Sequence, residues 1–276
     1  MAFLQINFLS QALMRTVNVN VILPTDKLPM PGAPEQPDRL FPTLYLLHGV
    51  LGSQVDWING TKLQRWAEEK DLAVVMPAGE NSFYVDHDRS DQHYGDFIGR
   101  ELVEQTRKML PLSRKREDTF LGGLSMGGYG ALRNGLKYHE TFSRVLALST
   151  ANVVDGIADA TEETPLFFQR RGFLERIFGD LSAVQGGDKD ILWLAGRLRE
   201  KGMTLPAVYM ACGLEDVLLP GNRKLRDCLK GNGFDLVYEE GPGNHEWDFW
   251  NEHLKRGLDW LPLNGTAGMN SGNVFA

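Results

Sequence analysis

The sequence predicts an α/β protein in which helices cover both faces of a mostly parallel central sheet. Three observations support this fold class: short apolar runs that end at glycine or proline, amphipathic stretches that alternate with them, and a length of 276 residues, enough for a large core. Hydrophobic residues make up 42% of the chain and charged residues 24%, a globular composition that argues against disorder throughout.

The chain is expected to begin with two strands, about residues 3–9 and 16–23, in which the residues facing one side are apolar. Residues 24–42 contain six prolines, which lack N–H donors and fix φ, so we expect a surface loop there. The continuous apolar run from Thr43 to His48 then predicts a strand buried on both faces.

The rest of the chain alternates between strands and helices. The further expected strands cover residues 72–76, 119–121, 145–148, 207–211 and 235–238, and the expected helices cover 61–70, 97–109, 125–139, 221–231 and 246–261. Residues 150–203 show helical patterns and no strand, so we expect a helical insert that either caps a pocket or packs onto the body. We expect one domain over residues 1–263, followed by a small, polar, disordered tail over 264–276.

The composition argues against several functions. A net charge of −7 repels phosphate polymers, so nucleic acid is a poor partner. No segment approaches the roughly 20 apolar residues that span a bilayer, and the first residues lack the basic region of a signal peptide, so we expect a cytoplasmic protein with no membrane partner. The two cysteines cannot form a disulfide framework or a four-cysteine zinc site. Association of the chain into a homo-oligomer is left open by the composition.

A candidate nucleophile lies in Gly123-Leu124-Ser125-Met126-Gly127, which matches G-x-S-x-G. The pattern is weak alone, but here it follows a predicted strand and opens a predicted helix, as a nucleophile elbow requires. Glycines at both ends relieve the crowding of so tight a turn. The alternative is a glycine-rich strand-to-helix turn without chemistry. We favour Ser125 as nucleophile.

A serine hydroxyl needs a base, and in elbow hydrolases the base follows the serine and the acid in the chain. Three histidines follow Ser125. His139 ends the helix that begins at the elbow, so it points away, and His253 is expected at the surface of the last helix. His245 lies in the loop between the last strand and the last helix, at the sheet edge where catalytic groups gather, and is the predicted base.

The third residue must accept the other imidazole N–H and fix its tautomer. Asp216 fits because it comes shortly after the strand at 207–211. Glu215 is its neighbouring competitor. Asp188 and Asp190 lie in the helical insert, where no strand would position them.

An oxyanion hole needs two backbone N–H groups, one of which normally follows the nucleophile, here at Met126. The second is expected from the loop after residues 43–48, where Val50 is favoured and Leu51 is the alternative. His48 is expected to brace this loop by hydrogen bonds rather than to act as a second base. Gly49 is predicted to contact substrate.

Two other features could carry chemistry. Trp57 is a candidate wall of the substrate site because it follows the oxyanion loop. Residues 86–93 contain two histidines and three aspartates that could hold a divalent metal, but an arginine stands among them and no regular spacing orders them. We expect a solvated loop there, and no metal or other cofactor.

The chain resembles the esterase D-type branch of the α/β-hydrolases, closest to the tributyrin esterase type. The resemblance rests on Tyr45-Leu46-Leu47-His48-Gly49 with Gly52 and Trp57, and on the stretch from Arg116 to Leu132 around the elbow. It covers about residues 3–261. It implies an α/β-hydrolase fold, a triad of Ser125, Asp216 and His245, and oxyanion donors at Met126 and at Val50 or Leu51. S-formylglutathione hydrolases of this group carry a histidine before the serine and a cysteine in the oxyanion loop, where this chain has Leu124 and Val50-Leu51.

These observations predict a serine esterase that hydrolyses short acyl esters of small molecules through an acyl-enzyme. Two alternatives share the same site: an acyltransferase, in which an alcohol replaces water, and an S-formylglutathione-type thioesterase. A third, of another class, is a non-catalytic binding module on a hydrolase scaffold.

Overall fold

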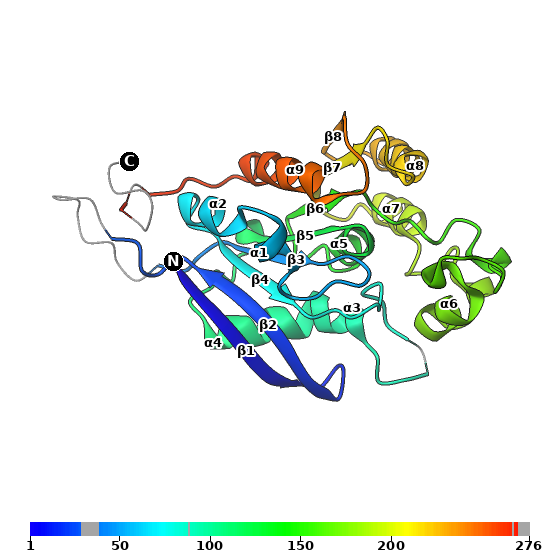
Figure 1. The fold of residues 1–276 in the computed structure, drawn as a ribbon, viewed down its shortest axis with the longest axis horizontal. Helices are drawn as coiled ribbons and strands as arrows, with labels where there is room; N and C mark the ends of the chain where they lie inside the picture. The colour runs from blue at the N-terminus through cyan, green and yellow to red at the C-terminus, as the bar shows by residue number, and fades with distance from the viewer. Residues whose placement is uncertain (29–38, 88, 267, 270–276) are drawn as a thin grey trace.

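The computed structural model describes residues 1–28, 39–87, 89–266, 268 and 269. Within these described residues, eight strands form one sheet in the order β1-β2-β4-β3-β5-β6-β7-β8 (Figure 1). The strands are β1 (Ala2–Ser10), β2 (Arg15–Leu23), β3 (Thr43–Leu47), β4 (Ala73–Pro77), β5 (Thr119–Leu124), β6 (Arg144–Leu148), β7 (Ala207–Gly213) and β8 (Leu236–Gly241). From β4 to β8 all neighbours are parallel, whereas β2 is antiparallel to both β1 and β4. The predicted α/β class with a mostly parallel sheet is confirmed.

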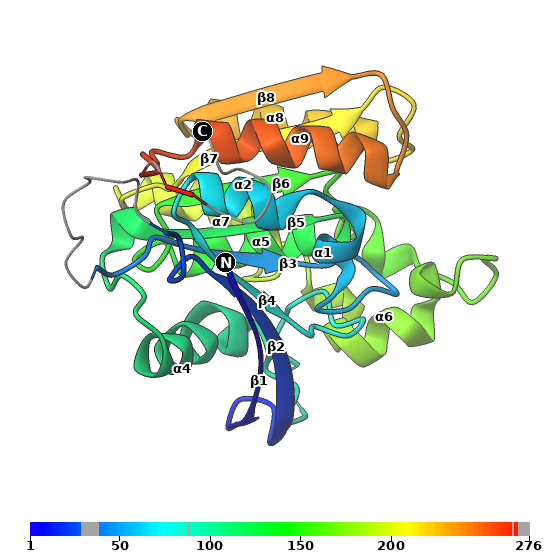
Figure 2. The same ribbon diagram turned by 60° about the vertical axis from the view of Figure 1, so that its left-hand side comes forward.

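Helices pack on both faces of this sheet, which gives two buried apolar clusters (Figures 1 and 2). The α-helices are α1 (Asp56–Gly60), α2 (Leu63–Glu69), α3 (Tyr94–Asp96), α4 (Leu102–Met109), α5 (Met126–Lys137), α6 (Arg171–Phe178), α7 (Ile191–Glu200), α8 (Leu219–Gly231) and α9 (Trp247–Trp260). A π-helical segment over Phe97–Glu101 joins α3 to α4, and 3-10 turns cover Arg116–Asp118, Ile157–Asp159, Phe167–Gln169 and Leu181–Ala183. Helices α1, α2 and α9 bury their apolar residues on one face, and α4, α5, α7 and α8 bury theirs on the other.

The central strands are buried because their residues are apolar on both sides, as predicted for parallel strands between helical layers. Every residue of β3, β4 and β5 is buried. By contrast, all six residues of β8 at the sheet edge are only half-buried.

The segment between β6 and β7 contains no strand, as expected, and every one of its residues 150–203 is described. Helix α7 at its end belongs to the body, since it contacts α5 and α8 and buries Ile191, Leu194, Ala195 and Leu198 in the core. Only the part that includes α6 projects from the body (Figures 1 and 2).

The described part of the carboxyl-terminal tail contacts the body. The Thr266 hydroxyl donates to Asp71 Oδ2 over 2.6 Å, and Met269 pairs with Leu28 in a short antiparallel bridge. The described residues do not include 267 and 270–276 of the tail or 29–38 of the proline-rich stretch. At those positions the disordered tail and the surface loop stay predictions. Within the described ranges, no helix combines the length and apolar character needed to cross a membrane.

Candidate active site

Ser125 stands in the turn between β5 and α5 with φ +54° and ψ −118°, a conformation that costs free energy for any residue with a Cβ. The flanking glycines make the turn possible. A Cβ on Gly123 would lie 2.3 Å from the Gly127 carbonyl oxygen, and one on Gly127 would lie 2.4 Å from the carbonyl oxygen of Leu47 on β3. The predicted strand–turn–helix context of the elbow is therefore present.

The structure brings Ser125, Asp216 and His245 together. His245 Nε2 lies 3.0 Å from Ser125 Oγ, and His245 Nδ1 lies 2.9 Å from Asp216 Oδ2. The three residues follow β5, β7 and β8, which are parallel, so their carboxyl ends share one edge of the sheet. Both distances are hydrogen-bond distances, so the three side chains form a proton-sharing chain.

The surroundings of Asp216 favour the ionised form of its carboxyl group. Its side chain is inaccessible to solvent, and this burial would raise its pKa. Hydrogen bonds from His245, from the Leu218 backbone N–H (2.8 Å) and from Ser149 outweigh the burial, so the pKa lies below the ordinary aspartate value. A carboxylate acceptor at Nδ1 holds the imidazole proton on that nitrogen and leaves Nε2 free to accept the Ser125 hydroxyl.

Glu215, the competitor of Asp216, contacts the histidine loop instead of the imidazole. Its Oε2 accepts the Gly243 N–H over 2.7 Å, and its own N–H donates to the Gly243 carbonyl over 3.2 Å. The other side of His245 packs edge-on against Trp250, with ring centroids 4.9 Å apart. Trp250 Nε1 in turn donates to Ser149 Oγ over 3.0 Å. The imidazole is thus oriented by its loop and by helix α9.

The favoured candidates for oxyanion donors are the backbone N–H groups of Met126 and Val50. Met126 N–H is in the first turn of α5, where the helix offers no acceptor. Val50 follows β3 in the adjacent loop. The alternative donor Leu51 is already engaged, because its N–H donates to Asn81 Oδ1 over 2.8 Å. Leu51 has φ +65° and a largely exposed side chain. This geometry favours Val50 over Leu51.

The bracing role expected for His48 is confirmed. Its Nδ1 lies 2.8 Å from the Gly49 carbonyl oxygen, and its Nε2 accepts the Gly79 N–H over 2.8 Å. Burial lowers the pKa of His48, which keeps the ring neutral with its proton on Nδ1. Tyr84 adds a third tie by donating its hydroxyl to the His48 carbonyl over 3.0 Å. Both His48 nitrogens are therefore occupied, which leaves it no role as a second base.

The prediction that Trp57 forms a wall of the substrate site is wrong. The side chain is 1% exposed, and its Nε1 donates to the Leu47 carbonyl over 3.0 Å. It packs edge-on against Trp247 with ring centroids 5.7 Å apart. Trp57 lies on the short helix α1 and faces inward, so its side chain supports the end of β3. Gly49 is also buried, and a Cβ there would lie 2.8 Å from Leu124 Cδ1, so its visible role is close packing beside Ser125.

His253 is not a surface residue, contrary to the prediction. It is 4% exposed, stacks on Phe249 with centroids 4.1 Å apart, and lies 3.2 Å from the Tyr209 hydroxyl. The reason is its place on α9, whose buried face includes Phe249, Trp250, Leu254 and Gly257. It is remote from the triad contacts, as is His139, which follows the end of α5.

In the part of the loop over residues 86–93 that is described, Asp86 contacts the body. Asp86 pairs with Lys137 (3.0 Å) and accepts the Asp96 N–H (2.8 Å). Residue 88 lies outside the description, and among the described residues no three His, Cys, Asp or Glu side chains form a metal-binding group.

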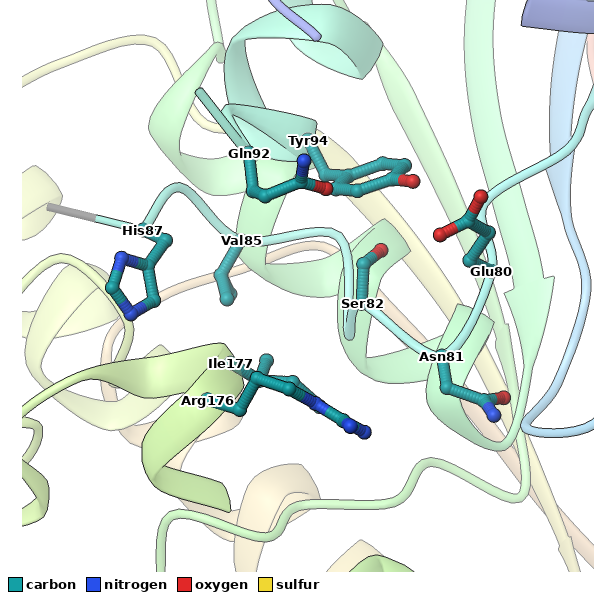
Figure 3. Close-up of a pocket in the computed structure, with 9 residues that line it drawn as sticks. All are labelled: Glu80, Asn81, Ser82, Val85, His87, Gln92, Tyr94, Arg176 and Ile177. Carbon is teal, nitrogen blue, oxygen red and sulfur yellow. The ribbon is translucent and has the colours of Figure 1, made fainter. Parts of the chain in front are cut away.

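The sequence interpretation missed Asn81 and the cavity next to it. This cavity, of about 400 Å³, lies between the loop after β4 and helix α6. Figure 3 shows Glu80, Asn81 and Ser82 along one side and Arg176 and Ile177 along another, with Gln92 and Tyr94 across from them. Asn81 follows the carboxyl end of β4, at the same sheet edge as the triad, and that position was the available signal.

Comparison with known proteins gives consistent likenesses. Residues 10–261 match the family model described as Putative esterase. An acetyl esterase from Caldicellulosiruptor saccharolyticus is 42% identical over 261 residues, which cover 95% of this chain and 98% of that protein. Two solved structures from Staphylococcus aureus each align with 94% of this chain and with 98% of their own chain. Fluorophosphonate-binding serine hydrolase F has 28% sequence identity and a TM-score of 0.82. The S-formylglutathione hydrolase FrmB has 29% sequence identity and a TM-score of 0.80.

Proposed function

Because this chain belongs to the Putative esterase family, we propose that it is a serine carboxylesterase in which Ser125, His245 and Asp216 act as nucleophile, base and orienting acid. The predicted α/β-hydrolase fold and the predicted esterase family are both confirmed. The single observation that supports the residue roles is the unbroken chain from Ser125 Oγ through His245 to Asp216, at 3.0 and 2.9 Å.

The proposed reaction begins when Ser125 Oγ attacks the ester carbonyl carbon and its proton passes to His245 Nε2. The carbonyl π electrons move to the oxygen, and the N–H groups of Val50 and Met126 donate to that oxyanion. The tetrahedral intermediate then collapses. The bond to the leaving oxygen breaks, and His245 gives its proton to the departing alcohol.

An acyl-enzyme on Ser125 remains. Water enters, gives a proton to His245 and attacks the acyl carbon. Collapse of the second intermediate returns the proton to Ser125 Oγ and releases the acid. Asp216 stabilises the imidazolium in both halves of the reaction and keeps its own charge.

We propose a short acyl group because the acetyl esterase of Caldicellulosiruptor saccharolyticus is 42% identical over nearly the whole chain. The cavity lined by Asn81 and Arg176 is the proposed site for the rest of the substrate, since Asn81 directly contacts the oxyanion loop. Its lining offers many hydrogen-bonding groups, which suits a polar small molecule.

The test measures hydrolysis of p-nitrophenyl esters from acetate to octanoate by the wild type and by Ser125→Ala. We expect kcat/KM to be highest for acetate or butyrate. Ser125→Ala should lower kcat by on the order of 10⁴-fold or more while the protein stays folded. Labelling by a fluorophosphonate should likewise require Ser125. Full activity in Ser125→Ala would overturn the proposal, and failure of folded wild type to label or turn over would favour a non-catalytic binding module.

A second candidate, S-formylglutathione hydrolysis, is favoured by the likeness to FrmB at 29% identity. The sequence departs from that type at Leu124 and at Val50-Leu51. Comparing kcat/KM for S-formylglutathione and for p-nitrophenyl acetate separates the two, and product analysis with added alcohols tests acyl transfer.

A further inference from the structure

Strand β1 is an unusually bare edge of the sheet. It is nine residues long, against a common strand length of about five or six, and contains no charged residue and no proline. Proteins normally protect such edges with charges, prolines or bulges, because the unpaired N–H and C=O groups can pair with another strand. Over the described chain, β1 forms backbone hydrogen bonds only with β2. Figures 1 and 2 show β1 on the outside of the sheet.

This edge is held rigid by the body. On the inner side of the hairpin, Leu4, Ile6 and Phe8 pack against the large apolar cluster. At the turn end, the buried carboxylate of Glu101 accepts hydrogen bonds from Ser10 Oγ (2.5 Å) and the Gln11 N–H (2.6 Å). A preformed strand loses little conformational entropy when a partner pairs with it.

One face of the hairpin is uncharged and arranged in rows; it is exposed all along β1, whereas on β2 Asn20 and Ile22 are buried against the body. Going along β1, the exposed residues are Phe3, Gln5, Asn7 and Leu9, and their partners on β2 are Ile22, Asn20, Asn18 and Thr16. The Asn7 amide donates to the Asn18 side chain. The two middle rows are therefore all amides, whereas the outer rows consist of apolar residues and one threonine.

We propose that β1 pairs antiparallel with β1 of a second copy of this chain, about a two-fold axis through Ile6. In that register Phe3 lies opposite Leu9 of the second copy and Gln5 lies opposite its Asn7. The two-fold axis repeats both pairs with the two copies exchanged. This single register therefore places apolar side chains opposite apolar side chains, and amides opposite amides, along the exposed side of the strand. The amide rows then continue across four strands, and the two sheets join into one.

The charges near both ends of β1 do not oppose this pairing. The Met1 ammonium is paired with Asp26 at 2.7 Å, and Arg15 is paired with Glu80 at 2.5 Å. A neutral, self-complementary edge fits an identical partner because an isologous contact requires the same surface to match itself.

The test changes only the two central amides and compares two charge arrangements. Gln5→Lys/Asn7→Lys places lysine opposite lysine at both positions, whereas Gln5→Lys/Asn7→Glu places lysine opposite glutamate at both. Light scattering coupled to size exclusion, and sedimentation equilibrium over a concentration series, give the mass. We expect wild type at about twice the 30.9 kDa chain mass. The lysine–lysine variant should dissociate, with Kd raised about 100-fold or more, and the lysine–glutamate variant should stay paired.

Melting temperature and turnover of p-nitrophenyl acetate should be similar in the two variants, because both replace exposed residues remote from Ser125. A wild type that stays monomeric at all concentrations would overturn the proposal. So would a lysine–lysine variant that associates as tightly as wild type, which would place the contact on another surface. A lysine–glutamate variant that dissociates as fully as the lysine–lysine one would exclude this register.

Discussion

The positive φ of Ser125 depends on the glycines at both ends of the turn, Gly123 and Gly127, where the surrounding atoms leave no room for a Cβ. Around Gly127 those atoms belong to the backbone of β3 and its following loop: the carbonyl oxygens of Leu47 and His48, at 2.4 and 2.6 Å from an added Cβ. Backbone atoms cannot rotate away as a flexible side chain can. Ser125 is therefore positioned by steric contact between the first turn of α5 and the end of β3.

Gly127→Ala should lower the free energy of unfolding by about 2–3 kcal/mol and reduce kcat strongly, because β3 or the elbow must shift. The measurements are urea denaturation and turnover of p-nitrophenyl acetate. Gly196→Ala is the matched control: Gly196 lies inside α7 with nothing within 4 Å of an added Cβ, so a gain of about 0.5–1 kcal/mol is expected. Equal effects of the two substitutions would contradict the steric account.

Asn81 holds the loop after β3, the proposed oxyanion loop, by accepting one hydrogen bond from Leu51 N–H. Asn81→Ala removes the acceptor and should lower kcat about 10-fold, a fraction of the loss of a whole oxyanion donor, with a smaller change in KM. Asn81→Asp keeps an acceptor oxygen and should retain most of kcat. If Asn81→Ala leaves kcat at the wild-type value, the loop holds its geometry without this contact.

His253 gives a pH dependence to stability. Its burial lowers its pKa below the value of about 6.5 for an unfolded histidine, against the opposing attraction of Glu239 and Glu252. Between the two values the unfolded chain binds more protons than the folded chain. Stability therefore falls as pH drops through and below 6.5, by at most about 1.4 kcal/mol per pH unit from this group. His253→Gln should flatten that slope in urea denaturations at pH 5 to 8, and an unchanged slope would refute the assignment.

At the scale of the elements, α5 fastens two loops that flank the cavity. Arg133 is fully buried and donates to Asp188 Oδ2 (2.6 Å) and to the Asp188 carbonyl (2.9 Å). Lys137, one turn later, contacts both Asp188 and Asp86. The segment before α7 and the loop after β4 are thus bound to the same helix. Asp188 makes these structural contacts and is not part of the hydrogen-bonded chain at Ser125.

Arg133→Met should cost about 2–3 kcal/mol of stability, because it removes a buried cation and leaves Asp188 with fewer partners. Asp188 is half-exposed, which keeps the cost below that of a fully buried pair. Arg197→Met, at an exposed pair with Glu200, should change stability by less than about 0.5 kcal/mol. Urea denaturation measures the free energy of unfolding of both variants. If Arg133→Met lowers it no more than Arg197→Met does, the buried pair has no structural role.

At the scale of the whole molecule, the sequence predicted the sheet because buried parallel strands are short apolar runs, as in β3, β4 and β6. Strand β8 extends beyond the predicted residues 235–238 to Gly241, because its charged residues lie at the edge, where Glu240 pairs with Arg223 at 2.6 Å. An edge strand can carry charges that a pattern search takes for a loop.

The meeting of Ser125, Asp216 and His245 was predictable because these residues lie where strands end and a motif marks the first of them. Trp57, His253 and Asn81 were not, since each depends on a contact between segments distant in the sequence: Trp57 with Trp247, His253 with Tyr209, Asn81 with Leu51. Burial of a tryptophan or a histidine is decided by such tertiary neighbours, which no local pattern encodes.

The three side chains of the proposed triad come from positions 125, 216 and 245, on loops after β5, β7 and β8. The proposed site is therefore complete only when loops from three distant parts of the chain have come together. Recovery of p-nitrophenyl acetate turnover after dilution from denaturant would report that assembly, whereas circular dichroism reports the total helix and strand content.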